Sequence, residues 1–162
     1  MTNLSKRGNV WLAVGGLVKD EKGRWLVVKK KYSGLKDMWS LPAGFVKETE
    51  TVDQAILREI KEETGIEAKM IGLMGVRTGV IKDEISDNML LFLLETDQTE
   101  VTIQEKELSE AKFMTEQELL QDNSSSLLIR YLIENPPNNR MEIIKGLDPG
   151  NQFHYTTYHL IK

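Results

Sequence analysis

The stretch GFVKETETVDQAILREIKEETGI, residues 44–66, decides how the rest of the chain is interpreted. Neither glycine nor proline interrupts it between its two glycines. Thr51 and Gln54 have the spacing of a capping box at the start of a helix, and Gly65 suits the position just after a helix ends. The sequence therefore predicts a helix over 52–63.

Carboxylates interrupt the apolar face of this expected helix. At about 100° per residue, Ile56 shares a face with Glu59 and Glu63, where an amphipathic helix ordinarily stays apolar. Like charges at these spacings cost about 0.2–0.5 kcal/mol per pair. A solvated acidic face tied to Arg58 is one interpretation, but it does not explain why glutamates continue the apolar stripe. A hard divalent cation does, because Mg²⁺ is held by carboxylate oxygens and phosphates.

The spacing of these residues resembles the signature of the Nudix hydrolases. That signature is glycine, five residues, glutamate, seven residues, Arg-Glu, an aliphatic residue, any residue, Glu-Glu, any residue, glycine and an aliphatic residue. It is filled here by Gly44, Glu50, Arg58-Glu59-Ile60, Glu62-Glu63 and Gly65-Ile66. One small departure is Ala43, where many members have a second glycine. The resemblance extends from about Val10 to Glu134.

This resemblance implies an α/β fold, the Nudix-type α/β/α sandwich with a mixed β-sheet between helices. It also implies hydrolysis of a diphosphate bond in a nucleoside diphosphate linked to another moiety, with Mg²⁺ or Mn²⁺ as the metal. Glu59, Glu62 and Glu63 match the family's metal-binding glutamates, and Gly44 matches a glycine whose carbonyl often joins the metal shell. Arg58 matches an arginine that orients a glutamate of this signature, which spans residues 44–66 and is called the box below. The alternative function is a non-catalytic nucleotide-sensing module, although such modules usually have degraded boxes.

The chemistry of the carboxylates agrees with a metal requirement. Three ionised carboxylates would repel a diphosphate, whereas divalent ions would polarise a phosphoryl oxygen and lower the pKa of a water molecule for in-line attack on phosphorus. Family members differ in the general base, which is a box glutamate in some and a downstream loop glutamate in others. The downstream candidates are Glu84, Glu105, Glu107 and Glu110.

Trp39 and Arg77 are the candidates for substrate contacts. Trp39 lies close to the box and has a ring that suits stacking on a base, but a tryptophan beside Leu41-Pro42 is more often a core residue. Arg77 and the lysine run 29–31 suit phosphate binding, but a solvated strand end is the favoured interpretation of both. The proline of many ADP-sugar hydrolases and the tyrosine of dinucleoside polyphosphate hydrolases are missing after the box, which weakens both subclasses.

Alternating apolar runs outside the box predict strands and further helices. The expected strands are a hairpin over 10–18 and 25–29, then 70–78, 89–95 and 112–114. A short helix is expected after Thr115, and a second over 124–134 that Pro136-Pro137 end. Strands before and after a central helix, with more helix at the end, indicate an α/β or α+β protein with a mixed sheet between helices.

We expect a Nudix domain over 1–137 and a C-terminal extension over 138–162. The extension carries many apolar residues: Met141, Ile143, Ile144, Phe153, Tyr155, Tyr158, Leu160 and Ile161. That is too much apolar surface for a free end, so we expect it to pack on the domain or at a homodimer interface, with a strand over 153–161. His154 and His159 are expected to be ordinary residues of this extension.

Composition excludes several other classes. The 162 residues carry a formal charge of −4 and no cysteine. We therefore do not expect long nucleic acids as partners. We expect a small nucleotide-type substrate instead. An isomerase resembling isopentenyl diphosphate isomerase is disfavoured, because it needs an active-site cysteine. No apolar run is long enough to span a membrane, and Met1–Gly8 lacks the apolar core of a signal peptide, so we expect a cytoplasmic protein.

Overall fold

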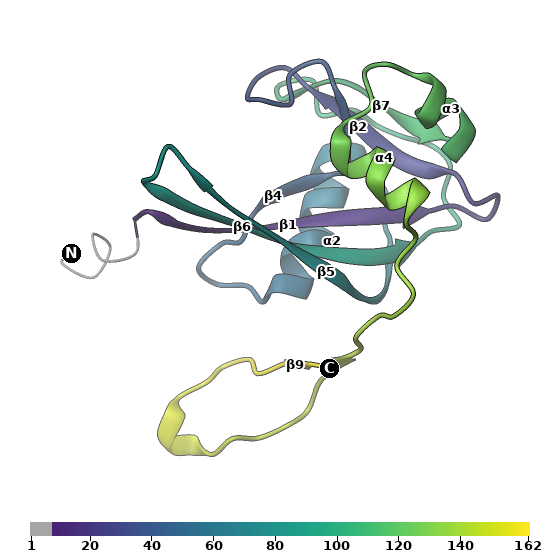
Figure 1. Cartoon of the computed structure of the whole chain (residues 1–162). Coiled ribbons are helices and arrows are strands. Elements are labelled where there is room, and N and C mark those ends of the chain that lie inside the picture. Colours follow the sequence, from purple (N-terminus) through teal and green to yellow (C-terminus); the bar gives the residue numbers. More distant parts are fainter. Residues whose placement is uncertain (1–7) are drawn as a thin grey trace.

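The computed structural model describes residues 8–162. Residues 1–7 lie outside the described residues, and they include most of the Met1–Gly8 segment, which was predicted not to be a signal peptide. The strands are β1 (Val10–Lys19), β2 (Trp25–Lys30), β3 (Trp39–Ser40), β4 (Ala43–Phe45), β5 (Lys69–Ile81), β6 (Ile85–Glu95), β7 (Leu108–Met114), β8 (Ile143–Ile144) and β9 (Leu160–Ile161) (Figure 1). The helices are α2 (Val52–Thr64), α3 (Glu116–Gln121), α4 (Leu127–Glu134) and the 3₁₀ turn η1 (Asn151–Phe153).

The main sheet is mixed, and β1 lies at its centre. β1 runs parallel to β6 along its whole length, from Val10 beside Ser86 to Lys19 beside Glu95. Its other edge pairs antiparallel with β4 and then with β2, and β7 adds to β2. The strand order along the main path is β3-β2-β1-β6-β5. The expected mixed sheet is confirmed.

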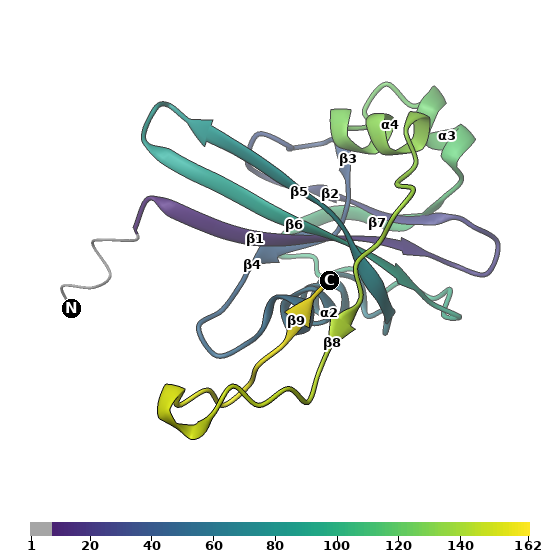
Figure 2. The same cartoon turned by 60° about the horizontal axis from the view of Figure 1, so that its bottom comes forward.

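Alternation along the strands divides the core into two clusters, one on each face of the sheet. Val14 and Val18 face α2 and join a cluster with Ile60, whereas Leu17 belongs to a second cluster with Leu119 of α3 and Ile129 of α4. Figure 2 shows α2 on one side of the sheet and α3 with α4 on the other. The expected α/β/α sandwich is therefore confirmed.

The helix predicted from the box is confirmed. Gln54 Oε1 accepts from the Thr51 backbone N–H at 3.0 Å, as the capping box requires. Gly65 ends the helix with φ of 72°, a left-handed conformation that glycine adopts without steric cost. The helix expected over 124–134 begins later, at Leu127. Its predicted start was wrong because residues 122–125 form a turn instead, in which Ser125 N donates to Asp122 O at 3.1 Å.

β5 and β6 are longer than the sequence predicts and form a long hairpin, and β1 lies beside β6 from Ser86 to Glu95 (Figure 1). Lys82 and Asp83 turn the chain with φ values of 53° and 58°. Two successive left-handed residues suit the right-handed twist of a hairpin. Residues between the expected strands 70–78 and 89–95 therefore pair with each other, as Gly79 does with Asp87, and Thr78 Oγ1 donates to Asn88 Oδ1 at 2.7 Å.

The C-terminal extension folds back as a small two-stranded sheet of β8 and β9. The strand expected over 153–161 was wrong: only Leu160–Ile161 is extended, because the chain turns at Gly150 and His154, which have φ of 114° and 58°. Met141 and Leu73 exchange two backbone hydrogen bonds of 2.8 and 2.9 Å, which join the extension to the edge of β5. Within residues 8–162, no helix has the length and apolar character needed to cross a membrane.

Candidate functional site

The site is built where β4 passes beside α2. A Cβ atom placed on Gly44 would lie 2.2 Å from Cδ and Oε1 of Glu59, so no other residue fits at position 44 while Glu59 keeps its position. Burial is the largest influence on Glu59, and it raises the pKa of this carboxyl against the opposing effect of Arg58. Two residues of the box that are distant in sequence are therefore in direct contact.

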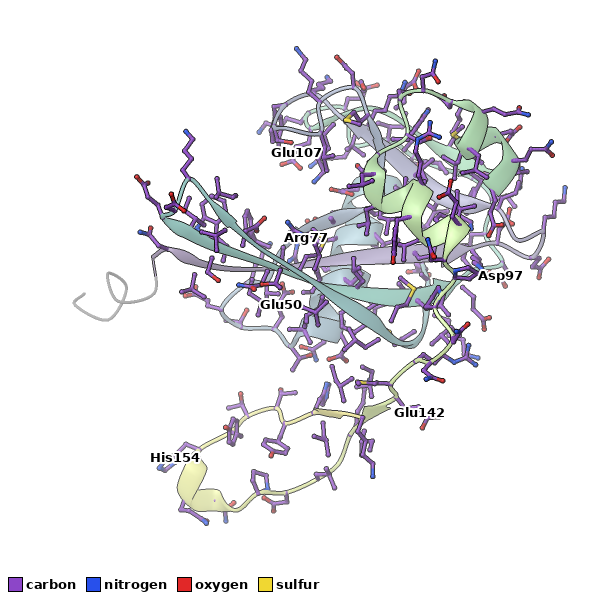
Figure 3. All side chains as sticks on the ribbon, in the orientation of Figure 1. Glu50, Arg77, Asp97, Glu107, Glu142 and His154 are labelled. Atoms are coloured by element: carbon purple, nitrogen blue, oxygen red, sulfur yellow. The ribbon has the colours of Figure 1, made fainter. Side chains whose placement is uncertain are left out.

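Arg58 connects Glu59 to the loop that precedes α2. Its Nη1 donates to Glu59 Oε1 at 2.8 Å, its Nε donates to Glu50 Oε2 at 2.8 Å, and its Nη2 donates to the Phe45 carbonyl at 3.1 Å. The hydrogen bonds from Arg58 lower the pKa of Glu50 and, in return, Glu50 raises the pKa of the guanidinium. A planar fork of donors is suited to holding these acceptors at once. Figure 3 labels Glu50 beside this junction.

Glu63 is the most buried carboxylate of the box. The residue is 1% exposed, and neither of its carboxylate oxygens accepts a hydrogen bond of good geometry from the described residues. Lys30 Nζ lies 3.4 Å from Glu63 Oε1 and donates to the carbonyl of Ala43 at 3.0 Å. Burial raises the pKa of Glu63 to about 7, even though the nearby ammonium opposes this shift.

Glu62 is the box glutamate that solvent reaches. Its side chain is 49% exposed and lies 3.2 Å from Arg58 Nη1 and 3.9 Å from Lys47 Nζ. Each box carboxylate thus faces a basic side chain. Accordingly, no three His, Asp or Glu side chains within residues 8–162 are grouped closely enough to hold a metal ion.

The donor set nevertheless fits a hard divalent cation. The three glutamates supply only oxygen atoms, and those of Glu63 are buried without hydrogen-bond partners. Gly44 brings the backbone of β4 against Glu59. Magnesium and manganese prefer such oxygen ligands, and buried unpaired carboxylate oxygens are costly unless a cation or a donor meets them.

Trp39 and Arg77, the two candidates for substrate contacts, lie in different environments. Trp39 is 1% exposed; its Nε1 donates to Asp122 at 3.0 Å, and Lys29 and Lys112 lie over its ring. Its position is that of a core residue. Arg77 lies on β5 (Figure 3), where its Nη1 donates to Asp87 Oδ2 at 2.6 Å, and its substrate role stays a prediction.

The downstream glutamates are spread over three places. Glu84 lies at the tip of the β5–β6 hairpin, and Glu110 on β7 lies 3.6 Å from Lys29. Glu105 and Glu107 belong to a loop that contacts the end of α2, where Gln104 N donates to the Glu63 carbonyl at 3.1 Å. The choice of general base among these residues stays open.

Two functional contacts escaped the sequence interpretation. Lys30 belongs to a lysine run that was interpreted as a solvated strand end, yet its Nζ lies 3.4 Å from Glu63. The signal for this contact is the alternation along β2, which places Lys30 on the same face of the strand as Leu26. Leu26 packs in the core cluster on the α2 side. His159 was expected to be an ordinary residue of the extension. Its Nδ1 lies 2.9 Å from the buried Asp53 Oδ1 in the first turn of α2. No local pattern links residues so far apart in sequence.

Comparison with known proteins agrees with this geometry. Residues 10–133 match the family model described as the NUDIX domain. An ADP-ribose pyrophosphatase of Methanocaldococcus jannaschii is 40% identical over 72 residues, which cover 44% of this chain and 42% of that protein. An uncharacterized Nudix hydrolase of Listeria monocytogenes is 32% identical over 133 residues, covering 79% of this chain and 77% of that one. The chain spans less than half the length of the first four curated relatives it matches.

Solved structures share the fold. The MutT NUDIX hydrolase from Burkholderia pseudomallei superposes with a TM-score of 0.67 at 21% identity, covering 78% of this chain and 98% of that one. The NUDIX domain of Shewanella oneidensis NrtR, solved in complex with ADP ribose, gives a TM-score of 0.67 at 21% identity over 76% of this chain and 84% of that chain. At these identities the likeness concerns the fold alone.

Proposed function

The chain belongs to the Nudix family, and from that premise we propose that it is a metal-dependent hydrolase of a diphosphate bond. The substrate class is a nucleoside diphosphate linked to another moiety, and water attacks phosphorus. The observation that carries the proposal is the buried Glu63 carboxylate, whose oxygens accept no hydrogen bond, next to the contact between Gly44 and Glu59. Buried carboxylate oxygens that lack hydrogen-bond partners are ligands that a hard cation can take.

In this proposal, Glu59, Glu62, Glu63 and the Gly44 carbonyl hold Mg²⁺ or Mn²⁺. When bound, the ion supplies positive charge to the diphosphate and acidity to a water molecule. Arg58 fixes Glu59 by donating to its Oε1, and Glu50 fixes Arg58 in turn. Glu62 reaches solvent, so it is the box carboxylate in position to orient a water molecule.

The names of two related proteins suggest where a substrate search should begin. One relative is an ADP-ribose pyrophosphatase, and one structural neighbour was solved with ADP ribose. ADP-ribose is therefore the first compound of a panel that also contains dinucleotides, dinucleoside polyphosphates and nucleoside triphosphates. The missing proline after the box argues against an ordinary ADP-sugar hydrolase, so the panel has to be broad.

The experiment measures release of nucleoside monophosphate or phosphate from this panel with Mg²⁺ present. We expect at least one compound to be cleaved, and water labelled with ¹⁸O to place the label on a phosphate product. Glu63→Gln and Glu62→Gln are expected to lose roughly 10³-fold or more in kcat, as when an essential part of a catalytic unit is removed, with unchanged circular dichroism. The control is Glu67→Gln, an exposed glutamate paired with Lys61, which should keep the wild-type rate.

A binding module without activity is the competing outcome of the same experiment. Such a module would bind a panel compound in calorimetry and release no product at any metal concentration. Near-normal rates in the Glu62 and Glu63 variants would contradict the assignment of these residues.

A further inference from the structure

Lys30 places an ammonium group between β4 and α2, the two elements that carry the expected metal ligands. The side chain comes from the end of β2 and donates to the Ala43 carbonyl on β4 at 3.0 Å. The same Nζ lies 3.4 Å from Oε1 of Glu63 on α2. The Lys30 side chain is 18% exposed, so the charge is largely removed from water. One flexible cation therefore joins the two elements that carry the box.

The pairing between Lys30 and Glu63 is electrostatic and geometrically incomplete. Glu63 is almost fully buried, yet neither oxygen accepts a hydrogen bond, and 3.4 Å is long for a charge-assisted one. An ammonium has three donors, and the hydrogen bond to Ala43 uses one of them. Lys30 thus compensates the buried charge of Glu63 without meeting the hydrogen-bonding capacity of its oxygens.

We propose that Lys30 is a tethered counter-cation of the metal site, which neutralises Glu63 in the metal-free protein and leaves it when a divalent ion binds. The proposal rests on the proposed function, because it requires a divalent ion beside Glu63. Two cations on one carboxylate repel each other, and Mg²⁺ or Mn²⁺ carries the larger charge and takes oxygen ligands directly. Lys30 is the partner that can move, because its stem is flexible and its head is strongly hydrated.

The movement requires only the Lys30 side chain, because the backbone of Lys30 is held by its pairing with Leu108 on β7. β2 ends at Lys30, and the register between β2 and β7 shifts between Lys29 and Lys30. The ammonium stays attached to the rim of the site after it leaves Glu63. Lysine binds phosphate as a point charge, so a substrate diphosphate is its next partner. Lys30 consequently weakens the binding of the divalent ion and strengthens the binding of substrate.

The test compares Mn²⁺ binding, measured by electron paramagnetic resonance, in the wild type, Lys30→Gln and Lys30→Met. Both variants should bind Mn²⁺ at least fivefold more tightly than the wild type, and Lys30→Gln should have a raised KM for the cleaved substrate. Lys29→Met is the matched control, since the adjacent Lys29 pairs with Glu110 and should leave Mn²⁺ binding unchanged. Lys30→Gln keeps a side-chain N–H for the Ala43 carbonyl, so it serves if Lys30→Met does not fold.

The outcomes separate the two proposals. Wild-type or weaker Mn²⁺ affinity in Lys30→Gln, with an active wild type, would overturn the counter-cation and leave the proposed function standing. An unchanged KM in Lys30→Gln would overturn the phosphate role of the released ammonium. A wild-type protein that neither binds Mn²⁺ nor cleaves any compound of the panel would overturn both proposals.

Discussion

The carboxylate of Glu59 lies so close to Gly44 that a single added Cβ atom would come within 2.2 Å of it. The contact joins the first residue of the box to its central glutamate, between β4 and α2. The box begins with glycine because a side chain at position 44 would collide with Glu59, and not because the backbone there needs a positive φ.

Gly44→Ala should displace Glu59 and lower kcat roughly 100-fold, the size expected when a catalytic group moves by about 1 Å. The reason is steric, because the added methyl group and the carboxylate cannot occupy the same space. The measurement is steady-state kinetics on the compound identified by the panel. Gly79→Ala is the control, since a Cβ there meets no atom within 4 Å. An active Gly44→Ala enzyme would show that Glu59 is free to move without loss.

Arg58→Ala should lower the free energy of unfolding by about 2–3 kcal/mol, because buried carboxylates would lose charge-assisted hydrogen bonds. Arg58→Lys should recover only part of the loss, since an ammonium cannot donate to Glu50, Glu59 and the Phe45 carbonyl in the same arrangement. Urea denaturation measures both. Lys61→Ala, which removes an exposed ion pair with Glu67, should leave the free energy of unfolding close to that of the wild type. Equal stability of Arg58→Lys and the wild type would contradict the role of the guanidinium group in holding these three acceptors.

Asp122→Asn should be destabilising at neutral pH and progressively less so in acid. Asp122 accepts hydrogen bonds from Ser124 and from Trp39 Nε1. These hydrogen bonds lower the pKa of Asp122 from 3.8 to about 2, and those from Ser124 have the larger effect. A lowered pKa means that the folded state favours the carboxylate, so the stabilisation is present above pH 3.8 and disappears as the pH falls towards about 2. We expect a difference of about 1–2 kcal/mol at pH 6. A difference independent of pH would contradict this assignment.

Removal of residues 138–162 should lower the melting temperature by at least about 5 °C. Ile143 and Ile161 pack against the core cluster on the α2 side, and the extension pairs with Leu73 through backbone hydrogen bonds. His159→Gln should have a smaller effect in the same direction, because it weakens the contact with the buried Asp53. His154→Gln is the control at the far tip of the extension (Figure 3). A truncated protein of unchanged stability and activity would show that the extension is not needed for the fold.

Local patterns predict the elements of this protein well. The α2 helix, its capping residue Gln54 and the left-handed Gly65 all follow from short-range rules about backbone hydrogen bonds and steric freedom. The strand ends were less predictable. β5 and β6 continue through polar residues because cross-strand hydrogen bonds and a tight turn at Lys82-Asp83 compensate for weak apolar alternation.

Contacts between distant segments could not be predicted from local patterns. Lys30 meets Glu63 only because the sheet order brings the end of β2 beside β4 and α2. His159 meets Asp53 only because Gly150 and His154 turn the extension back. The alternation along β2 puts Lys30 on the face towards α2 but does not identify Glu63 as its partner, and no periodic signal links His159 to Asp53. The polar partners of these carboxylates therefore required the three-dimensional structure.

Metal dependence is the sharpest test of the claim that the box carboxylates hold a divalent cation. The measurement is the initial rate of product release from the panel compound by protein treated with EDTA and then titrated with Mg²⁺. We expect no turnover in metal-free buffer and a rate that rises and saturates as Mg²⁺ is restored, since unshielded carboxylates repel a diphosphate. Full turnover in metal-free buffer would contradict the claim.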